Sequence, residues 1–146
     1  MRLIIKTSVF ALLGMLLAAE AIAATPEEII RPIQDQWAEI KYRMPDKEQA
    51  DQYRTLAGKS RRIAENHPGM AEPLIWEGIV LSSEAGVRSA LSALSLAKEA
   101  GQRFEEALNI NDQALKGSAY TSMATLYAKV PGWPIGFGDK ARAEEL

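Results

Sequence analysis

Apolar residues between Pro26 and Met44 recur every three or four positions, which is the spacing of one face of an α-helix. The stripe consists of Ile29, Ile33, Trp37, Ile40 and Met44. Residues three or four apart lie one above another on a helix, so this pattern predicts a helix with one apolar side. After residue 24 no segment alternates apolar and polar positions, and β-branched residues are sparse. The hydrophobic pattern therefore predicts an all-α protein.

Helix-starting and helix-breaking residues divide this pattern into several segments. Thr25 and Pro26, followed by two glutamates, predict a helix start with a cap, a first-turn proline and acidic groups near the positive end. Pro32 is expected to kink this helix or to mark where its regular part begins. Asp46 is expected to cap the next helix. Breaks are predicted at Met44-Pro45-Asp46, Pro68-Gly69, Pro73 and Lys116-Gly117-Ser118.

The best-defined helices carry small and large residues in a fixed order. Tyr120, Met123, Ala124 and Tyr127 give large, aliphatic, small and aromatic side chains at helical spacing. An earlier helix carries Ala100, Phe104 and Ala107, in which an aromatic residue stands between two small ones. Small residues let two helix backbones approach closely, and the aromatic ring fills the space beside them. Weaker copies are Trp37, Ile40, Met44; Trp76, Ile79, Val80; and Ala57, Arg61, Ala64. The order predicts three helix pairs.

These residues resemble the tetratricopeptide-repeat superfamily over about residues 26–146. The segment GSAYTSMATLYAKVPGWPIGFGDKA is similar to a group of exported bacterial repeat proteins that includes the T-component of TRAP-type, periplasmic substrate-binding transport systems. This narrower resemblance rests on residues 71–141. It implies an all-helical solenoid of about three repeats, the last incomplete, that binds proteins or a small ligand and catalyses nothing. Lys41, Ser83 and Arg61 depart from the repeat pattern.

All three helix pairs are longer than the standard unit, in which the first aromatic and the first alanine of the second helix lie about 16 residues apart within a period of roughly 34. Here Trp37 to Ala57 spans 20 residues, Trp76 to Ala100 spans 24, and Tyr120 to Ala141 spans 21. The additional residues must extend the helices or lie between them. Equivalent turns of a solenoid lie along one edge, so we expect the additions on one side, where binding faces often lie.

The third addition contains an unusual loop, residues 130–138. Pro131 and Pro134 restrict the backbone, while Gly132, Gly136 and Gly138 permit sharp turns. Its aromatic residues either fold back onto their own helix pair or form the wall of a binding site. Tyr120 and Tyr127 fit the repeat core and could also reach a groove. The candidate binding residues are Trp133, Phe137, Pro131, Pro134, Tyr120 and Tyr127.

Two other surfaces allow a structural and a functional interpretation. Five serines are interspersed with alanine and leucine and favour either close helix packing or a groove lined with small hydroxyls: Ser82, Ser83, Ser89, Ser92 and Ser95. Gly86, in the same stretch, could end one helix before another begins. The densest basic patch consists of Arg54, Lys59, Arg61 and Arg62. This patch is interpreted as solvated surface, with an acidic partner as the alternative.

The first residues have the pattern of an export signal. Arg2 and Lys6 precede an apolar run from Val9 to Ala19, and Ala21-Ile22-Ala23 supplies a cleavage site. A membrane anchor is the alternative, but spanning needs about twenty apolar residues, and Glu20 ends this run early. The sequence predicts a signal peptide at 1–23, a domain at 24–146 and a periplasmic or secreted location. The absence of cysteine excludes a lipid-modified N-terminal Cys.

The composition offers little for catalysis or nucleic-acid binding. The chain has 17 basic and 19 acidic residues, without the basic excess that nucleic acid rewards. His67 is the only histidine and no nucleophile–base pair is evident, so neither a metal, a cofactor nor an enzyme is predicted. We expect an exported adaptor that binds another protein or peptide, or alternatively an accessory protein that binds an apolar small ligand for a transport system. The short final segment, residues 139–146, leaves repeat surface uncovered, which predicts self-association or a shortened relative of a longer protein.

Overall fold

The computed structural model describes residues 23–146, and the predicted signal peptide lies outside these residues except for Ala23. The described chain is helical and contains no β-strand, only an isolated bridge between Gly132 and Gly138. This confirms the all-α prediction. None of the helices between residues 23 and 146 combines the length and the apolar character needed to cross a membrane. The elements are α1 Pro26–Arg43, α2 Asp46–Asn66, α3 Ala71–Ala85, α4 Ala90–Ile110, the 3-10 helix η1 Ala114–Lys116, α5 Ser118–Lys129 and α6 Lys140–Glu145.

Local signals set most of the helix ends. Thr25 caps α1 through a reciprocal capping box with Glu28, as its sequence predicts. Helix α1 continues through Pro32 to Arg43. The prediction that Asp46 caps α2 is wrong, because Asp46 is already the first residue of that helix and no side chain caps it. Gly86 follows α3 at its C-terminal end, as predicted.

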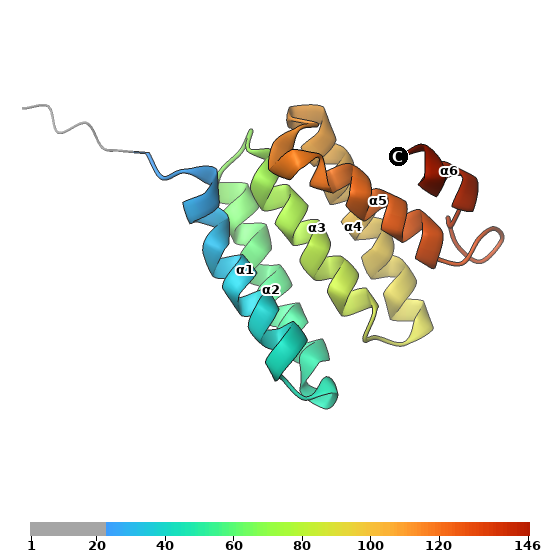
Figure 1. The fold of residues 1–146 in the computed structure, drawn as a ribbon. Helices are drawn as coiled ribbons and strands as arrows, with labels where there is room; N and C mark the ends of the chain where they lie inside the picture. The colour runs from blue at the N-terminus through green and yellow to red at the C-terminus, as the bar shows by residue number, and fades with distance from the viewer. Residues whose placement is uncertain (1–22) are drawn as a thin grey trace, which may run out of the picture.

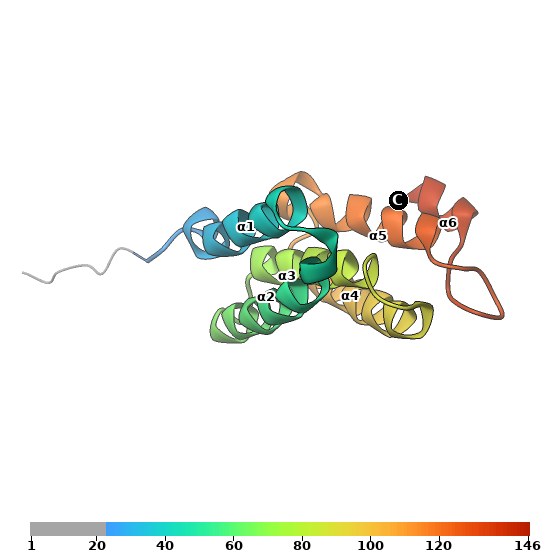
Figure 2. The same ribbon diagram turned by 90° about the horizontal axis from the view of Figure 1, so that it is seen from below.

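The helices run back and forth, so that consecutive helices are antiparallel. Figure 1 shows the turns α1–α2, α3–α4 and α5–α6 along one edge, and the connections α2–α3 and α4–α5 at the opposite edge. Figure 2 shows α1 and α5 on one side of α3, with α2 and α4 on the other. Helices α1 and α2 have 18 and 21 residues and are joined only by Met44 and Pro45. The extra length of the first pair therefore extends its helices. The connection between α5 and α6, by contrast, is a long loop, residues 130–139.

Close packing between α3 and α4 depends on a glycine opposite an aromatic ring. Phe104 is wholly buried, and so are Ala100 and Ala107 on either side of it. A Cβ atom at Gly78 would lie 2.5 Å from a ring carbon of Phe104. The Phe104 ring thus occupies the space that any other residue at position 78 would need, and it holds α3 and α4 close together.

All four residues of the basic patch are exposed, as the interpretation as solvated surface requires, and two of them also pair with buried carboxylates. The Nε atom of Arg61 lies 3.2 Å from Oε1 of Glu77, whose side chain is buried, and Arg61 also pairs with Glu99. Arg103 contributes a second cation, 4.0 Å from the same Glu77 oxygen. Arg54 similarly lies 3.7 Å from the buried Glu84. The acidic partners come from α3 and α4, which are distant in sequence, and this is why the patch looked unpaired.

Burial of Glu77 has an electrostatic consequence. Desolvation raises the pKa of its carboxyl above the ordinary value of 4.5, although the hydrogen bond from Arg61 and the positive charges of Arg103 and Arg61 oppose the shift. One carboxylate oxygen, Oε2, has no hydrogen-bond partner within residues 23–146. The ion cluster joins α2, α3 and α4 at a cost in desolvation.

Candidate functional site

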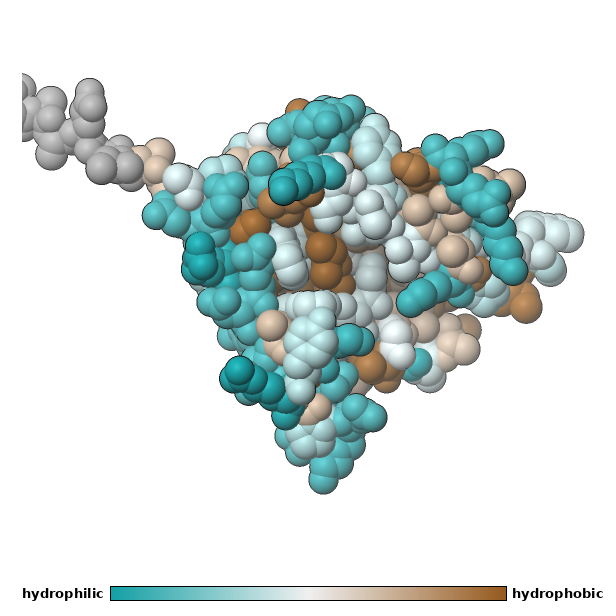
Figure 3. Space-filling model, viewed as in Figure 1, coloured by the Kyte–Doolittle hydropathy of each residue, from teal (hydrophilic) through white to brown (hydrophobic). Residues whose placement is uncertain are grey.

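A pocket of about 540 Å³ lies at the edge that carries the helix-pair turns. Figure 3 shows a depression over α3, between α1 and α5, where hydrophobic side chains are visible within a hydrophilic rim. Sites for small organic ligands commonly have volumes of about 300–1,000 Å³. The principal lining residues are Ile79, Ser82 and Ser83 of α3; Ala93, Leu94, Ala97 and Phe104 of α4; Ser122, Thr125, Leu126 and Lys129 of α5; and Val130, Pro131 and Ile135 of the following loop.

Small side chains on α4 create the space for this pocket. Ala90, Ala93 and Ala97 follow one another at intervals of three and four residues and therefore lie on one face of the helix. Because alanine ends at Cβ, this face leaves room between α4 and the loop after α5. Phe104 and Leu126 supply larger apolar surfaces at the base.

Two of the serines that the sequence placed in a small-residue face line the pocket. Ser82 Oγ donates to the carbonyl of Gly78 at 2.8 Å, and Ser83 Oγ donates to the carbonyl of Ile79 at 2.9 Å. Ser83 Oγ also accepts a hydrogen bond of 2.8 Å from Nε1 of Trp37. The alternative of a groove lined with small hydroxyls thus describes these two residues. The other serines of the stretch, Ser89, Ser92 and Ser95, are exposed and do not line the pocket.

The charged groups of the lining are both basic. Lys41 at the end of α1 and Lys129 at the end of α5 line the pocket, whereas no aspartate or glutamate does. Neither lysine makes a hydrogen bond or an ion pair within residues 23–146. The pocket therefore combines an apolar base with two accessible cations.

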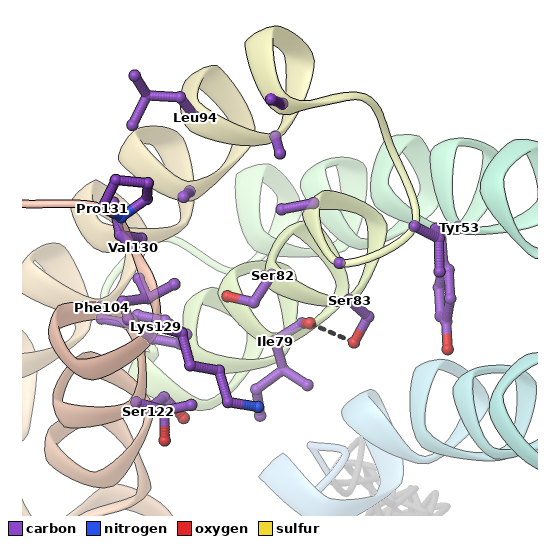
Figure 4. Close-up of a pocket in the computed structure, with 18 of the residues that line it drawn as sticks. Tyr53, Ile79, Ser82, Ser83, Leu94, Phe104, Ser122, Lys129, Val130 and Pro131 are labelled. Atoms are coloured by element: carbon purple, nitrogen blue, oxygen red, sulfur yellow. Dashed lines mark hydrogen bonds between the residues drawn. The ribbon is translucent and has the colours of Figure 1, made fainter. Parts of the chain in front are cut away.

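A buried hydroxyl belongs to the same lining. Tyr53 is 1% exposed, and its Oη atom has no hydrogen-bond partner among residues 23–146. Burial raises the pKa of the Tyr53 hydroxyl above its ordinary value of 10.0, so it remains a neutral donor at neutral pH. Figure 4 places Tyr53 beside Ser83, at the end of the pocket opposite Leu94 and Pro131. An unpaired buried hydroxyl costs about 1–3 kcal/mol.

The six candidate residues chosen from the sequence do not lie together in one site. Pro131 lines the large pocket, but Trp133 does not and is 90% exposed. Phe137 folds back onto α5, where its ring meets Tyr127 edge-on at 5.8 Å between centroids. The interpretation that the loop aromatics fold back onto their own helix pair therefore holds for Phe137, whereas Trp133 is exposed to solvent. Pro134 is exposed, and Tyr120 is half-buried on α5 outside the pockets described for residues 23–146.

Tyr127 and Phe137 instead line a smaller pocket of about 290 Å³ between α4 and α5. The guanidinium carbon of Arg142 lies 4.9 Å from the centre of the Tyr127 ring and joins α6 to this cluster. Backbone bonding supports the same contact, because Asp139 N–H donates to the carbonyl of Tyr127 at 2.9 Å. The aromatic pair thus anchors the end of the loop.

This division predicts different effects for the two aromatic residues. Trp133→Ala is expected to change the free energy of unfolding by less than about 0.5 kcal/mol, because an exposed side chain loses few contacts. Phe137→Ala is expected to lower it by about 1–2 kcal/mol, since a partly buried ring is removed. Urea unfolding followed by circular dichroism measures both. Equal losses for the two variants would contradict this placement of the loop.

The sequence interpretation missed most of the pocket. Lys41, Tyr53, Ile79 and Lys129 come from four different helices, and no local motif connects them. One signal was available, namely the alanines of α4, whose spacing marks a face without bulk. From the long loop, Val130, Pro131 and Ile135 line the pocket, whereas Trp133 does not.

In the part of the chain that the structure describes, no three His, Cys, Asp or Glu side chains are grouped so as to hold a metal ion. His67 ends α2, and its Nδ1 lies 2.8 Å from the carbonyl oxygen of Ile63. The pocket, with its apolar base and basic rim, is the most developed site. Comparison of the chain with protein-family models, with curated proteins and with solved structures gives no match.

Proposed function

We propose that this protein is a non-catalytic binding module whose large pocket accepts a small ligand with substantial apolar surface. The observation that carries the proposal is the pocket of about 540 Å³ with Phe104, Leu126 and alanines at its base. Burial of apolar ligand surface there would contribute about 25 cal/mol per Å² before the costs of association. In this function the protein acts as an exported accessory component of a transport system, as the resemblance over residues 71–141 implies.

The arrangement of the helices supports a tetratricopeptide-like form of this module. Consecutive antiparallel pairs place α1, α3 and α5 around the hollow, and the three within-pair turns share one edge. The small–large–small pattern of α4 is buried against α3, as the repeat requires. In such repeats the groove lined by the first helices of each pair is a common binding surface.

Filling the pocket tests this function. Ala93→Phe places a ring in the space that the α4 alanines leave open. We expect the neutral apolar dye N-phenyl-1-naphthylamine to bind the parent protein with enhanced fluorescence. Affinity is expected to fall at least about tenfold in the variant, equivalent to about 1.4 kcal/mol. Fluorescence titration measures this change directly.

Ser95→Phe is the matched control, because Ser95 lies on the same helix, is exposed and does not line the pocket. It adds the same ring without reducing the cavity, so its affinity for the dye is expected to equal that of the parent. Circular dichroism confirms that both variants fold. Absence of dye binding to the parent protein, or equal weakening by the two substitutions, would overturn the proposed function.

A protein–protein adaptor remains the second candidate, and a separate observation favours it. Leu91, Trp133 and Ile135 are 88%, 90% and 72% exposed, and exposed apolar side chains of this size mark interaction surfaces. Trp133 lies outside the pocket lining, so Trp133→Ala separates the two functions. An adaptor would lose affinity for an exported partner protein on this substitution, whereas a small-ligand site would keep its affinity for the dye.

A further inference from the structure

The charged side chains that line the large pocket are all positive. Its charged groups are Lys41 and Lys129, and it contains no acidic side chain, although the chain as a whole has a net charge of −2. Some arginines of the described chain pair with carboxylates, as Arg61 does with Glu77, and others, such as Arg62, do not. The two pocket lysines have no such partner among residues 23–146. Their charges are thus available to an anion in the pocket.

The end of the pocket at Tyr53 and Ser83 carries two hydroxyl groups and is called the polar end, whereas Ser122 lies away from it, beside Phe104 and Lys129. Figure 4 shows Tyr53 and Ser83 at one end, and Leu94 and Pro131 at the other. In the same view the Lys129 side chain extends from α5 toward Ile79, in the direction of the polar end. The Tyr53 hydroxyl at this end has no partner within hydrogen-bond distance among residues 23–146, and its oxygen is closed off from the pocket.

We infer that the ligand of this pocket is a small amphiphilic organic anion, with one acidic head group and an apolar body. The inference rests on the proposed small-ligand function and adds the chemistry of the head group. Lys41 and Lys129 attract the head group from opposite walls, since they belong to α1 and α5. The apolar body lies against Phe104, Leu126 and Leu94. A carboxylate accepts charge-assisted hydrogen bonds from both ammonium groups.

Three probes of equal chain length test this assignment: octanoate, octan-1-ol and octylammonium. Each is used to displace N-phenyl-1-naphthylamine from the parent protein at neutral pH. Octanoate is expected to displace the dye at a concentration about five to twenty times lower than octanol, as two partly exposed ion pairs would produce. Octylammonium is expected to be the weakest of the three. High salt should weaken octanoate and leave octanol unchanged, because salt screens exposed charges.

Two variants, Lys41→Gln and Lys129→Gln, test whether the preference for octanoate over octanol arises in the pocket. Each is expected to weaken octanoate about two- to fivefold, the size of an exposed ion pair, without changing octanol. Lys47→Gln is the matched control, because it removes the same charge from an exposed position of α2 that does not line the pocket. Both pocket lysines are exposed, so these variants are expected to fold as the parent does.

The outcomes distinguish the head-group inference from the function on which it rests. The inference of an anionic head group is contradicted if the dye binds but octanoate and octanol displace it equally. It is also contradicted if Lys47→Gln weakens octanoate binding as much as the pocket variants do. In both cases the proposed apolar binding site is unaffected. Preference for octylammonium overturns the head group in the same way. Failure of the parent protein to bind the dye removes the small-ligand function itself.

Discussion

Phe104→Ala is expected to lower the free energy of unfolding by about 3–5 kcal/mol, the largest stability effect of any single substitution proposed for this chain. The Phe104 ring is completely buried between α3 and α4, and it occupies the space beside Gly78. Truncation removes the apolar contacts of the ring and leaves a cavity that two long helices cannot readily close. Urea denaturation followed by circular dichroism at equilibrium gives the change.

Phe104→Leu is the control for this prediction. It keeps an apolar side chain of similar volume and is expected to cost less than about 1.5 kcal/mol. The difference between the two variants therefore reports the cavity and not the loss of aromatic character. A loss below about 1 kcal/mol for Phe104→Ala would show that α3 and α4 do not interlock through this ring.

Arg61→Met is expected to lower the free energy of unfolding by about 2 kcal/mol at neutral pH, because it leaves the buried Glu77 with only Arg103 at 4.0 Å. Removing one partner of a wholly buried ion pair lowers the free energy of unfolding by about 3–5 kcal/mol. The smaller figure applies here because about half of the Arg61 side chain, 48%, is exposed to solvent.

The cost of this substitution is expected to depend on pH. Burial already raises the folded-state pKa of Glu77 above its ordinary 4.5, and loss of Arg61 raises that pKa further. A carboxyl with a raised folded pKa favours folding while it is protonated, and this contribution disappears as pH rises from about 4.5 through the folded pKa. The destabilisation by Arg61→Met should therefore be small below pH 4.5 and complete at neutral pH.

A double-mutant cycle isolates the contribution of Glu77 from those of other carboxylates, including Glu99, which also pairs with Arg61. Thermal or urea unfolding is measured between pH 4 and 7 for the parent protein, Arg61→Met, Glu77→Gln and the double variant. In the Glu77→Gln background the cost of Arg61→Met is expected to be smaller and less dependent on pH. The same pH dependence in both backgrounds would contradict the role of this pair.

The sequence by itself determined the helical class and several local features. The capping box of Thr25, the end of α3 at Gly86 and the buried residues Ala100, Phe104 and Ala107 all follow from spacing and residue type. These properties could be predicted because a helix is stabilised by groups three or four residues apart, which lie within a short stretch of sequence. The prediction for Asp46 failed by one residue, as helix ends often do.

Tertiary structure decided the features that depend on distant residues. Arg61 is separated from Glu77 by 16 residues and from Glu99 by 38, so their pairing follows only from the packing of α2 against α3 and α4. The pocket requires side chains from five helices and from the loop after α5, and the different positions of Trp133 and Phe137 depend on where that loop meets α5. Helical periodicity says which side of a helix is buried. Only packing decides which neighbour covers that side and where small residues leave a cavity.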